Sequence, residues 1–298
     1  MKVCPACRTN YSRPDWECPD CGYLPVRVDG FVALAPDFAS SGGGFRPEVF
    51  EKLATLEERN FWFRARNRLI VWGLKRYCPN MQRFMEIGCG TGYVLAGVAN
   101  AYPAASLVGS EIFSVGLPFA ALRASSAELI QMDARKIPYV DEFDVIGAFD
   151  VLEHIEEDEA VLAAMLNSLR PGGRVAITVP QHPWLWSTSD DIACHVRRYK
   201  IGELREKVLR AGFKVEFETS FVSLLLPVML ASRLNKQKSN VQDDSLSELN
   251  LPNWLNRSLE TAMNFERQLI QIGLRFKLGG SRLLIASKER LCHEHSIQ

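Results

Sequence analysis

One stretch decides the fold: Arg83-Phe-Met-Glu-Ile-Gly-Cys-Gly-Thr-Gly-Tyr-Val-Leu-Ala-Gly-Val-Ala99. Its first part, residues 83–87, is short, mostly apolar and ends at a glycine, which is typical of a buried parallel strand. Its last part, residues 93–99, spaces apolar residues as a helix does. Between them, Gly88, Gly90 and Gly92 let the backbone turn sharply and leave bare peptide beside the first N–H groups of the helix. The stretch therefore predicts a strand, a glycine turn and a helix around a ligand.

The residue before the glycines indicates the charge of that ligand. The glycine pattern alone fits an ordinary tight turn equally well, but Glu86 at the strand's end would repel a pyrophosphate and suits a cation. Glu-Ile-Gly-Cys-Gly-Thr-Gly resembles the first motif of class I S-adenosylmethionine (SAM) methyltransferases, whose ligand carries an ammonium and a sulfonium. The resemblance implies an α/β fold with a doubly wound, seven-stranded Rossmann-like sheet. It also implies that Glu86, Gly88, Gly90 and Gly92 hold the amino-acid end of SAM.

Length and charge limit the class of protein. The 298 residues suffice for one large or two modest domains. Lys plus Arg and Asp plus Glu both total 35, so a strongly basic surface for nucleic acid is not favoured. The first residues form no apolar leader, and no apolar run approaches the roughly 20 residues of a membrane span. We therefore expect a cytoplasmic protein.

Four cysteines near the N-terminus have the spacing of a zinc ribbon. Cys4, Cys7, Cys18 and Cys21 form two CxxC pairs that can present four thiolates to a structural zinc ion. A redox CxxC pair is the alternative, but no βαβ pattern surrounds these residues. Residues 1–37 are predicted to form the ribbon, which resembles those that precede some bacterial ribosomal-RNA methyltransferases. Residues 38–46, rich in glycine and serine, are predicted to be a linker, and residues 47–298 the methyltransferase domain.

Acids at the ends of later strands match the same family. Glu111 ends a strand at residues 106–112, where it can accept both ribose hydroxyls. Asp133 ends the next strand, and the resemblance implies that Asp133 and Ala134 contact the adenine. Asp150 follows a fourth strand, at the edge where open α/β sheets bind ligands. The acidic run 156–159 reads as a solvated first turn of a helix.

Two further segments carry aromatic and basic residues. Residues 47–77 read as one helix whose Trp62 and Arg66 resemble a segment that closes over the cofactor, although an amphipathic helix packing on the sheet explains them equally well. Residues 181–200 contain an Asp-(four residues)-His-x-Arg-Arg-Tyr pattern, which resembles the type 11/12 branch of methyltransferases. That branch acts on small, saccharide or lipid-linked acceptors, so the loop is expected to face the acceptor.

Histidines are the candidates for catalysis. His195 and His154 can each exchange a proton near neutral pH, which is needed if the acceptor is a hydroxyl. The pair Glu153-His154 also resembles the divalent-metal cluster of some RNA-terminal methyltransferases, but two ligands are too few to define such a site.

Residues 220–278 form an unusual insert before the last strand, 281–287, which is expected to lie antiparallel between the fifth and sixth strands. The insert has an apolar run at 221–231, a polar segment at 235–250 and a helix at 254–276. It is predicted to be a lid over a hydrophobic acceptor, and basic residues after the apolar run leave a peripheral membrane contact open.

Together these features predict a SAM-dependent methyltransferase that acts on a small-molecule, saccharide or lipid-linked acceptor. Two alternatives remain open. One is a ribosomal- or transfer-RNA methyltransferase that uses the zinc ribbon for RNA contact, and the other is a non-catalytic SAM-binding protein.

Overall fold

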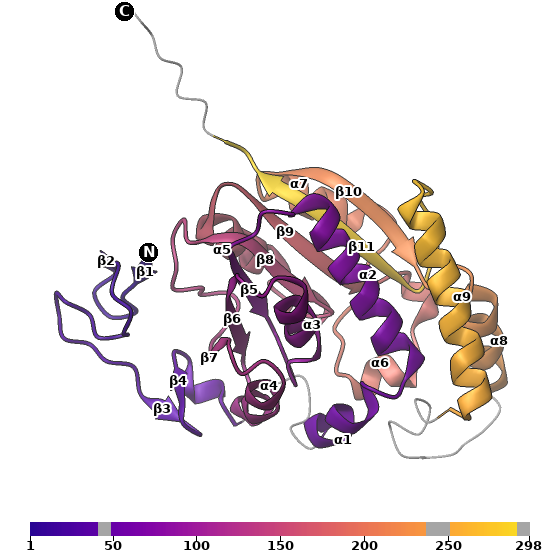
Figure 1. Cartoon of the computed structure of the whole chain (residues 1–298), viewed down its shortest axis with the longest axis horizontal. Helices are drawn as coiled ribbons and strands as arrows, with labels where there is room; N and C mark the ends of the chain where they lie inside the picture. The colour runs from indigo at the N-terminus through magenta and orange to yellow at the C-terminus, as the bar shows by residue number, and fades with distance from the viewer. Residues whose placement is uncertain (41–48, 237–250, 291–298) are drawn as a thin grey trace, which may run out of the picture.

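A mixed sheet crosses the middle of the molecule (Figure 1). The computed structural model describes residues 1–40, 49–236 and 251–290. Within them, the strand order is β10-β11-β9-β8-β5-β6-β7-β4-β3, with β5 to β9 parallel and β11 antiparallel between β9 and β10. The seven strands predicted from the sequence are β5 (Arg83–Ile87), β6 (Ser106–Glu111), β7 (Glu128–Gln131), β8 (Phe143–Phe149), β9 (Leu169–Pro180), β10 (Phe213–Phe221) and β11 (Ser281–Lys288).

Helices cover both faces of this sheet. The helices α2 (Phe61–Tyr77), α3 (Tyr93–Ala101), α4 (Leu117–Arg123) and α9 (Asn253–Gln271) pack on one face, and α5 (Asp158–Ser168) and α7 (Glu203–Arg210) pack on the other. Each face of the sheet has its own hydrophobic core. Because side chains alternate along each strand, Phe84 packs in the core under α2, α3, α4 and α9, and Met85 packs in the core under α5 and α7. This is the predicted doubly wound, Rossmann-like α/β architecture.

The N-terminal segment extends the sheet beyond the seven predicted strands. It contains β1 (Lys2–Val3), β2 (Asn10–Tyr11), β3 (Arg27–Val28), β4 (Phe31–Ala33) and the short turn η1 (Pro36–Phe38). β4 pairs in parallel with β7, with Val32 opposite Ile130. Trp16 packs edge-on against Tyr139, and its indole N–H donates to Glu128. The segment is therefore joined to the sheet of the larger domain; most of the predicted linker lies outside the described residues.

The predicted single helix at residues 47–77 is wrong, because the chain breaks before Asn60. It forms α1 (Val49–Leu56) and α2, and the Asn60 side chain accepts the Trp62 N–H at 2.9 Å. An asparagine at this position satisfies one of the free N–H groups at a helix start, which favours a new helix there.

The insert forms α8 (Leu226–Lys236) and α9. α9 ends at Gln271, five residues earlier than predicted, just before Gly273 with φ +111°. One carboxylate oxygen of Glu266, on α9, accepts the N–H groups of Ser223 and Leu224 at 2.7 Å each, so α9 holds the approach to α8. The polar segment predicted at 235–250 falls almost wholly outside the described residues. Among the helices that the structure describes, none is long and apolar enough to cross a membrane.

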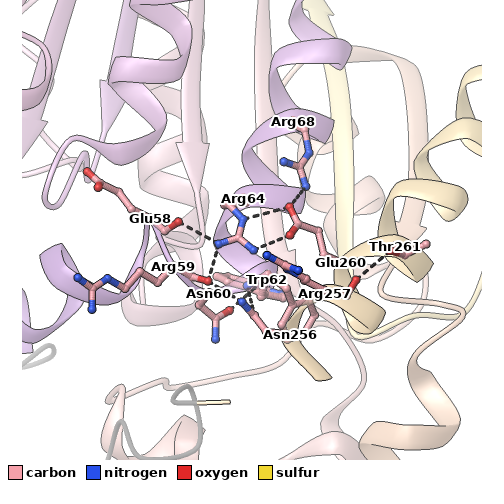
Figure 2. A network of polar contacts seen from close by, with 11 residues as sticks. Glu58, Arg59, Asn60, Trp62, Arg64, Arg68, Asn256, Arg257, Glu260 and Thr261 are labelled. Carbon is pink, nitrogen blue, oxygen red and sulfur yellow. Dashed lines mark hydrogen bonds and ion pairs between the residues drawn. The ribbon is translucent and has the colours of Figure 1, made fainter. Parts of the chain in front are cut away.

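α9 is also fastened to the start of α2 (Figure 2). Glu260 forms ion pairs with Arg64, at 2.5 Å, and with Arg68. Asn256 accepts the Phe61 N–H at 2.7 Å and donates to the Arg59 carbonyl at 2.7 Å. These bonds join the insert to the segment that carries the aromatic residues 61–63.

Candidate functional site

The four N-terminal cysteines converge in the structure. Their sulfur atoms lie within 4.8 Å of one another, with Cys4 and Cys21 3.7 Å apart and Cys7 and Cys18 3.6 Å apart. Zinc with Zn–S bonds of about 2.3 Å places tetrahedral sulfurs about 3.8 Å apart. The spacing therefore fits zinc held by four thiolates.

Two matching turns build this cluster. The Cys4 N–H donates to the carbonyl of Thr9, and the Arg8 N–H donates back to the carbonyl of Cys4. Cys18 repeats the arrangement, with its N–H bonded to the carbonyl of Tyr23 and its carbonyl bonded to the Gly22 N–H. Arg8 and Gly22 both have positive φ, at 66° and 69°. The backbone therefore presents both cysteine pairs in the same way.

The glycine loop, residues 88–92, joins β5 to α3 with three positive φ angles, 63° at Gly88, 53° at Gly90 and 78° at Gly92. A Cβ atom at Gly88 would lie 2.5 Å from Val151, and one at Gly92 would lie 2.6 Å from Ala120. One at Gly90 would meet nothing nearer than Phe50, at 4.0 Å. Close packing therefore requires glycine at the first and third positions, whereas the second borders open space.

Glu111 ties this loop to the next strand. Its carboxylate accepts the N–H groups of Gly90 and Ile112 at 2.9 Å and that of Phe113 at 3.3 Å. Burial raises the pKa of Glu111, and the three backbone N–H bonds oppose that rise. An ionised carboxylate has about four lone-pair sites, so acceptor capacity remains for a ligand hydroxyl.

Glu86 is a buried carboxylate whose surroundings favour a bound cation. It is 2% exposed, and its Oε2 has no hydrogen-bond partner within the described part of the chain. Burial raises its pKa well above the usual range, Arg66 opposes the rise, and Glu111 and Glu57 add to it. A cationic ligand would remove the cost of this unpaired buried acid.

A polar network that the sequence did not reveal holds the glycine loop from behind. The Thr91 hydroxyl donates to Glu57 at 2.5 Å, and Arg123 bonds Glu57, the Thr91 hydroxyl at 2.7 Å and the Ala54 carbonyl at 2.6 Å. Glu57 lies at the break between α1 and α2, so the interpretation of residues 47–77 as one helix concealed it. The Asn60 capping signal could have revealed the break.

Asp133 and Ala134 lie just after β7, as predicted for an adenine contact. The Asp133 carboxylate, however, already pairs with Arg135, whose Nη2 is 2.9 Å away and whose Nε bonds both oxygens. Burial alone would raise the pKa of Asp133, but the Arg135 bonds outweigh it and lower the pKa. An adenine amine would have to share this carboxylate with Arg135.

Arg66 is buried beside the cavity and pairs with Asp150. Its Nε lies 2.5 Å from the Asp150 carboxylate, its Nη2 donates to the Phe149 carbonyl at 2.8 Å, and its guanidinium lies over the Trp62 ring. Asp150 has φ +57°, an uncommon conformation for a non-glycine residue. The segment with Trp62 and Arg66 therefore reaches the cavity, and Asp150 neutralises the charge of Arg66 there.

The 181–200 loop is held by two buried carboxylates. It contains η4 (Pro183–Leu185) and α6 (Thr188–Ile192). Asp190 accepts from Arg198 at 2.7 Å and contacts Nδ1 of His195 at 2.9 Å. Arg197 and Tyr199 instead reach Asp158, at 2.7 and 2.6 Å. In the Arg-Arg-Tyr pattern, the middle residue therefore contacts Asp190, and the residues on either side of it contact Asp158.

The interpretation of residues 156–159 as a solvated first turn of a helix is wrong for Asp158. It is 3% exposed and also pairs with Lys207 at 2.5 Å. Burial would raise its pKa, but its bonds to Lys207 and Tyr199 lower it. Its partners lie about forty or more positions away in sequence, so no local pattern marks it.

The two predicted catalytic histidines lie together. The ring centroids of His154 and His195 are 4.8 Å apart, and Nε2 of His195 faces Glu153 at 4.0 Å. Burial, followed by the proximity of His195, lowers the pKa of His154 to about 4. Burial also raises the pKa of Glu153 well above its usual range. We call Glu153, His154 and His195 the histidine cluster.

One cavity of about 1530 Å³ connects these parts. Nine acidic side chains line it against three arginines, which favours a cationic ligand. Of the predicted site residues, Gly92 does not line the cavity but begins α3 behind the loop. The predicted residues that line it are Trp62, Arg66, Glu86, Gly88, Gly90, Glu111, Asp133, Ala134, Asp150, His154 and His195.

Comparisons with known proteins agree with this geometry. Residues 85–177 match the methyltransferase domain family. This segment contains most of β5, the glycine loop and most of β9, so the part of the chain that builds the cavity floor is similar to class I methyltransferases. It is 27% identical over 165 residues to a probable S-adenosylmethionine-dependent methyltransferase of Mycolicibacterium smegmatis, covering 54% of this chain and 62% of the relative. It is 31% identical over 107 residues to a ubiquinone biosynthesis O-methyltransferase of Aeromonas salmonicida, covering 34% of this chain and 45% of the relative.

A solved structure shares the fold of this chain. It is a phosphoethanolamine N-methyltransferase 2 of Haemonchus contortus in complex with S-adenosyl-L-methionine, with a TM-score of 0.51 and 19% identity. The match covers 76% of this chain and 52% of that chain. The predicted fold is therefore confirmed.

Proposed function

We propose that the chain transfers a methyl group from SAM to an oxygen atom of a small, partly apolar acceptor. The observation that carries this proposal is the shared cavity, in which the glycine loop, Glu86 and Glu111 open onto the same space as the histidine cluster. The methyl group of SAM is already activated by the sulfonium, so in-line transfer depends mainly on alignment inside one space.

The donor is assigned by charge and by hydrogen-bonding capacity. Glu86 supplies the buried carboxylate that the SAM ammonium requires, beside the bare peptide of Gly88 and Gly90. Glu111 has acceptor capacity left for ribose hydroxyls. Asp133 and Ala134 border the place for adenine, with Asp133 shared with Arg135.

The acceptor is assigned by the apolar wall of the cavity. Two segments supply much of that wall. The insert contributes Val222, Leu225, Val228, Met229, Leu255 and Leu259, and the segment of α1 and the start of α2 contributes Val49, Phe50, Leu53, Phe61, Trp62 and Phe63. Burying each large apolar group contributes roughly 1.5 to 3 kcal/mol. Among the predicted acceptor classes, the wall favours a lipid-linked or other partly apolar compound over a bare saccharide. The relative named for O-methylation in ubiquinone biosynthesis supports oxygen as the atom methylated.

Calorimetry with SAM and S-adenosylhomocysteine tests the donor. Glu111→Ala should weaken SAM binding by about tenfold or more, because charge-assisted hydrogen bonds contribute about 1.5 to 3 kcal/mol each. Glu216→Ala, on the outer part of β10, is the control and should bind normally. A wild-type protein that binds neither ligand would contradict the proposal. Labelled SAM with a panel of phenols, quinols and lipid-linked hydroxyls then tests the transfer.

The two alternative functions make different predictions. The cysteine cluster is the feature that favours an RNA methyltransferase, and RNA binding that weakens steeply with salt would support it. A non-catalytic SAM-binding protein would bind SAM but methylate no compound in the panel. The zero net charge of the chain weighs against an RNA methyltransferase. The closely held histidine cluster weighs against a non-catalytic SAM-binding protein.

The insert is proposed to act as a lid. Leu225 is buried and lines the cavity, and Glu266 holds the backbone next to it. Val228, one turn further, is 53% exposed, so it tests the membrane alternative. Co-sedimentation with anionic vesicles should show no binding. Pelleting that disappears in Val228→Asp would instead establish a membrane contact.

The cysteine cluster is proposed to hold structural zinc. The segment has only a small apolar core, around Tyr11 and Tyr23, so bound metal would supply much of its folding energy. By holding residues 1–21, zinc would also support the Trp16 contact with the sheet.

A further inference from the structure

Glu153 is the group at the site whose placement is least explained by the fold. It is 0% exposed, and neither carboxylate oxygen has a hydrogen-bond partner within the part of the chain that the structure describes. The arginines that act on it electrostatically, Arg66 and Arg198, are already paired with Asp150 and Asp190. A fully buried acid without a hydrogen bond is costly. Its carboxylate borders the cavity, where a bound cation would remove that cost.

Two histidines stand beside this carboxylate. One ligand atom from each of Glu153, His154 and His195 can be chosen so that all lie within 4.8 Å of one another. Ligand atoms bound to one ion at about 2.1 Å lie roughly 3 to 4 Å apart. Side-chain adjustments of less than about 1 Å would therefore bring the three into a shared coordination sphere.

The surroundings already orient His195 for metal binding. Its Nδ1 contacts Asp190 at 2.9 Å, which leaves Nε2 toward Glu153. Metal-binding histidines commonly have a carboxylate on the other ring nitrogen. The backbone is held as well, because the Val196 N–H donates to the carbonyl of Glu153 at 2.8 Å. This pairing fixes the 181–200 loop against η3 (Leu152–His154), which carries the other two groups.

We propose that Glu153, His154 and His195 bind a divalent transition-metal ion in the cavity. Two imidazoles and one carboxylate suit zinc, iron(II) or manganese(II) and leave coordination positions open. The sequence offered only Glu153 and His154 next to each other. The third ligand comes from a loop forty-one residues further along and is brought in by the fold.

The role of this ion in catalysis rests on the proposed methyl transfer. An acceptor hydroxyl bound at an open position would lose its proton to solvent more readily, because the ion stabilises the oxyanion. That oxygen then forms the O–CH3 bond as the S–CH3 bond of SAM breaks, giving a methyl ether and S-adenosylhomocysteine. The acceptor class is therefore a phenol or a vicinal diol, whose oxygen atoms can bind the ion.

Manganese(II) is the probe that separates this site from the cysteine cluster, because four thiolates bind manganese poorly. The full-length protein is titrated with manganese(II) and followed by electron paramagnetic resonance and by the shift in thermal unfolding. One ion per chain is expected. Glu153→Gln and His195→Gln should weaken binding by about 100-fold or more, since even partners of ligands change affinity by 10- to 100-fold. They should also abolish the metal-induced thermal shift.

His182→Gln is the matched control. His182 is a buried histidine at the start of the same loop, but its ring stacks on Trp184 and does not line the cavity. It should leave manganese binding unchanged. Wild-type protein that binds no manganese at millimolar concentration, or cluster variants that bind as wild type does, would overturn the proposal.

SAM affinity is measured on the same samples. It should be retained in both cluster variants, which shows that they are folded. If manganese binds and SAM does not, the proposed function fails while the metal site stands. If SAM binds and manganese does not, the proposed metal site fails while the proposed function stands.

Discussion

One carboxylate oxygen of Asp190 holds two residues of the 181–200 loop, with His195 Nδ1 at 2.9 Å and Arg198 Nε at 2.7 Å. Asp190 also closes the capping box of α6 by accepting the Ser187 N–H at 2.8 Å. A single buried side chain therefore sets the helix start, the histidine tautomer and the arginine position. This shared dependence makes Asp190 a sensitive point of the loop.

Replacing Asp190 should cost stability in a pH-dependent way. Burial would raise its pKa, but the His195 and Arg198 contacts lower it to about 2, below the ordinary value of about 3.9. A depressed carboxyl pKa stabilises the fold above about pH 4, and that contribution is lost as the pH falls toward 2. Asp190→Asn should therefore cost about 1 to 3 kcal/mol at pH 7 and less at pH 3.

Urea unfolding at the two pH values measures this difference. Asp191→Asn is the control, since Asp191 is exposed and its carboxylate accepts a hydrogen bond from the Trp186 indole at 2.8 Å. A loss of stability in Asp190→Asn that is equal at pH 7 and pH 3 would argue against the charge of Asp190 as its source.

The three loop glycines should separate folding from SAM binding. Gly88→Ala and Gly92→Ala place a methyl group on Val151 and Ala120, and both residues have positive φ. Together these effects should cost roughly 2 to 5 kcal/mol of stability. Gly90→Ala has only the backbone cost of about 1 to 2 kcal/mol. Its methyl group enters the open space of the cavity, so SAM affinity should fall.

Thermal unfolding and calorimetry with SAM check this pattern in parallel. Gly97→Ala, whose added Cβ would lie 2.6 Å from the Asn67 amide, serves as a control for crowding away from the loop. Equal losses of stability in all three loop variants would refute the assignment of Gly90 to the ligand.

Local signals in the sequence predicted most of the sheet. The strand at Arg83–Ile87 has the predicted bounds, because a short apolar run between turn residues is a local property. The pairing of β4 with β7 joins Val32 to Ile130 across almost a hundred residues. No local pattern records such a contact, so the two extra strands were not predicted.

The same distinction separates the site residues. Glu86, Glu111 and the glycines could be predicted as site residues because each belongs to a strand end with a recognisable pattern. Glu57 and Asp158 were missed because distant partners bury them, Arg123 in one case and Lys207 in the other. An acidic residue in a charged or helical stretch looks solvated until the fold supplies its cation.

Zinc removal should loosen the N-terminal segment while leaving the methyltransferase fold intact. The purified protein should contain one tightly bound zinc, and Cys18→Ser should lose it. Since Trp16 packs on Tyr139 and bonds Glu128, its fluorescence should change on zinc loss. Cys78→Ser, a buried thiol elsewhere, is the control. Full zinc content in Cys18→Ser would contradict a four-cysteine site.

The last prediction concerns Asn256, which links the insert to the start of α2 (Figure 2). Its side chain satisfies the Phe61 N–H and the Arg59 carbonyl from another helix. Losing such a cap costs about 1 kcal/mol. Asn256→Ala should therefore speed amide hydrogen exchange at residues 59–63 with little change in global stability. Because Trp62 lines the cavity, SAM or acceptor affinity should fall as well.

Thr261→Ala provides the comparison for that variant, because its hydroxyl bonds only the Arg257 carbonyl of its own helix among the contacts drawn in Figure 2. Glu260→Gln tests the ion pairs of the same link. Bonds from Arg64 and Arg68 lower the pKa of Glu260 to about 2, so its charge is present at every pH above that value. If Asn256→Ala and Glu260→Gln leave exchange at residues 59–63 unchanged, α9 does not position the aromatic segment. The insert would then contribute to the cavity only through the apolar side chains that line it.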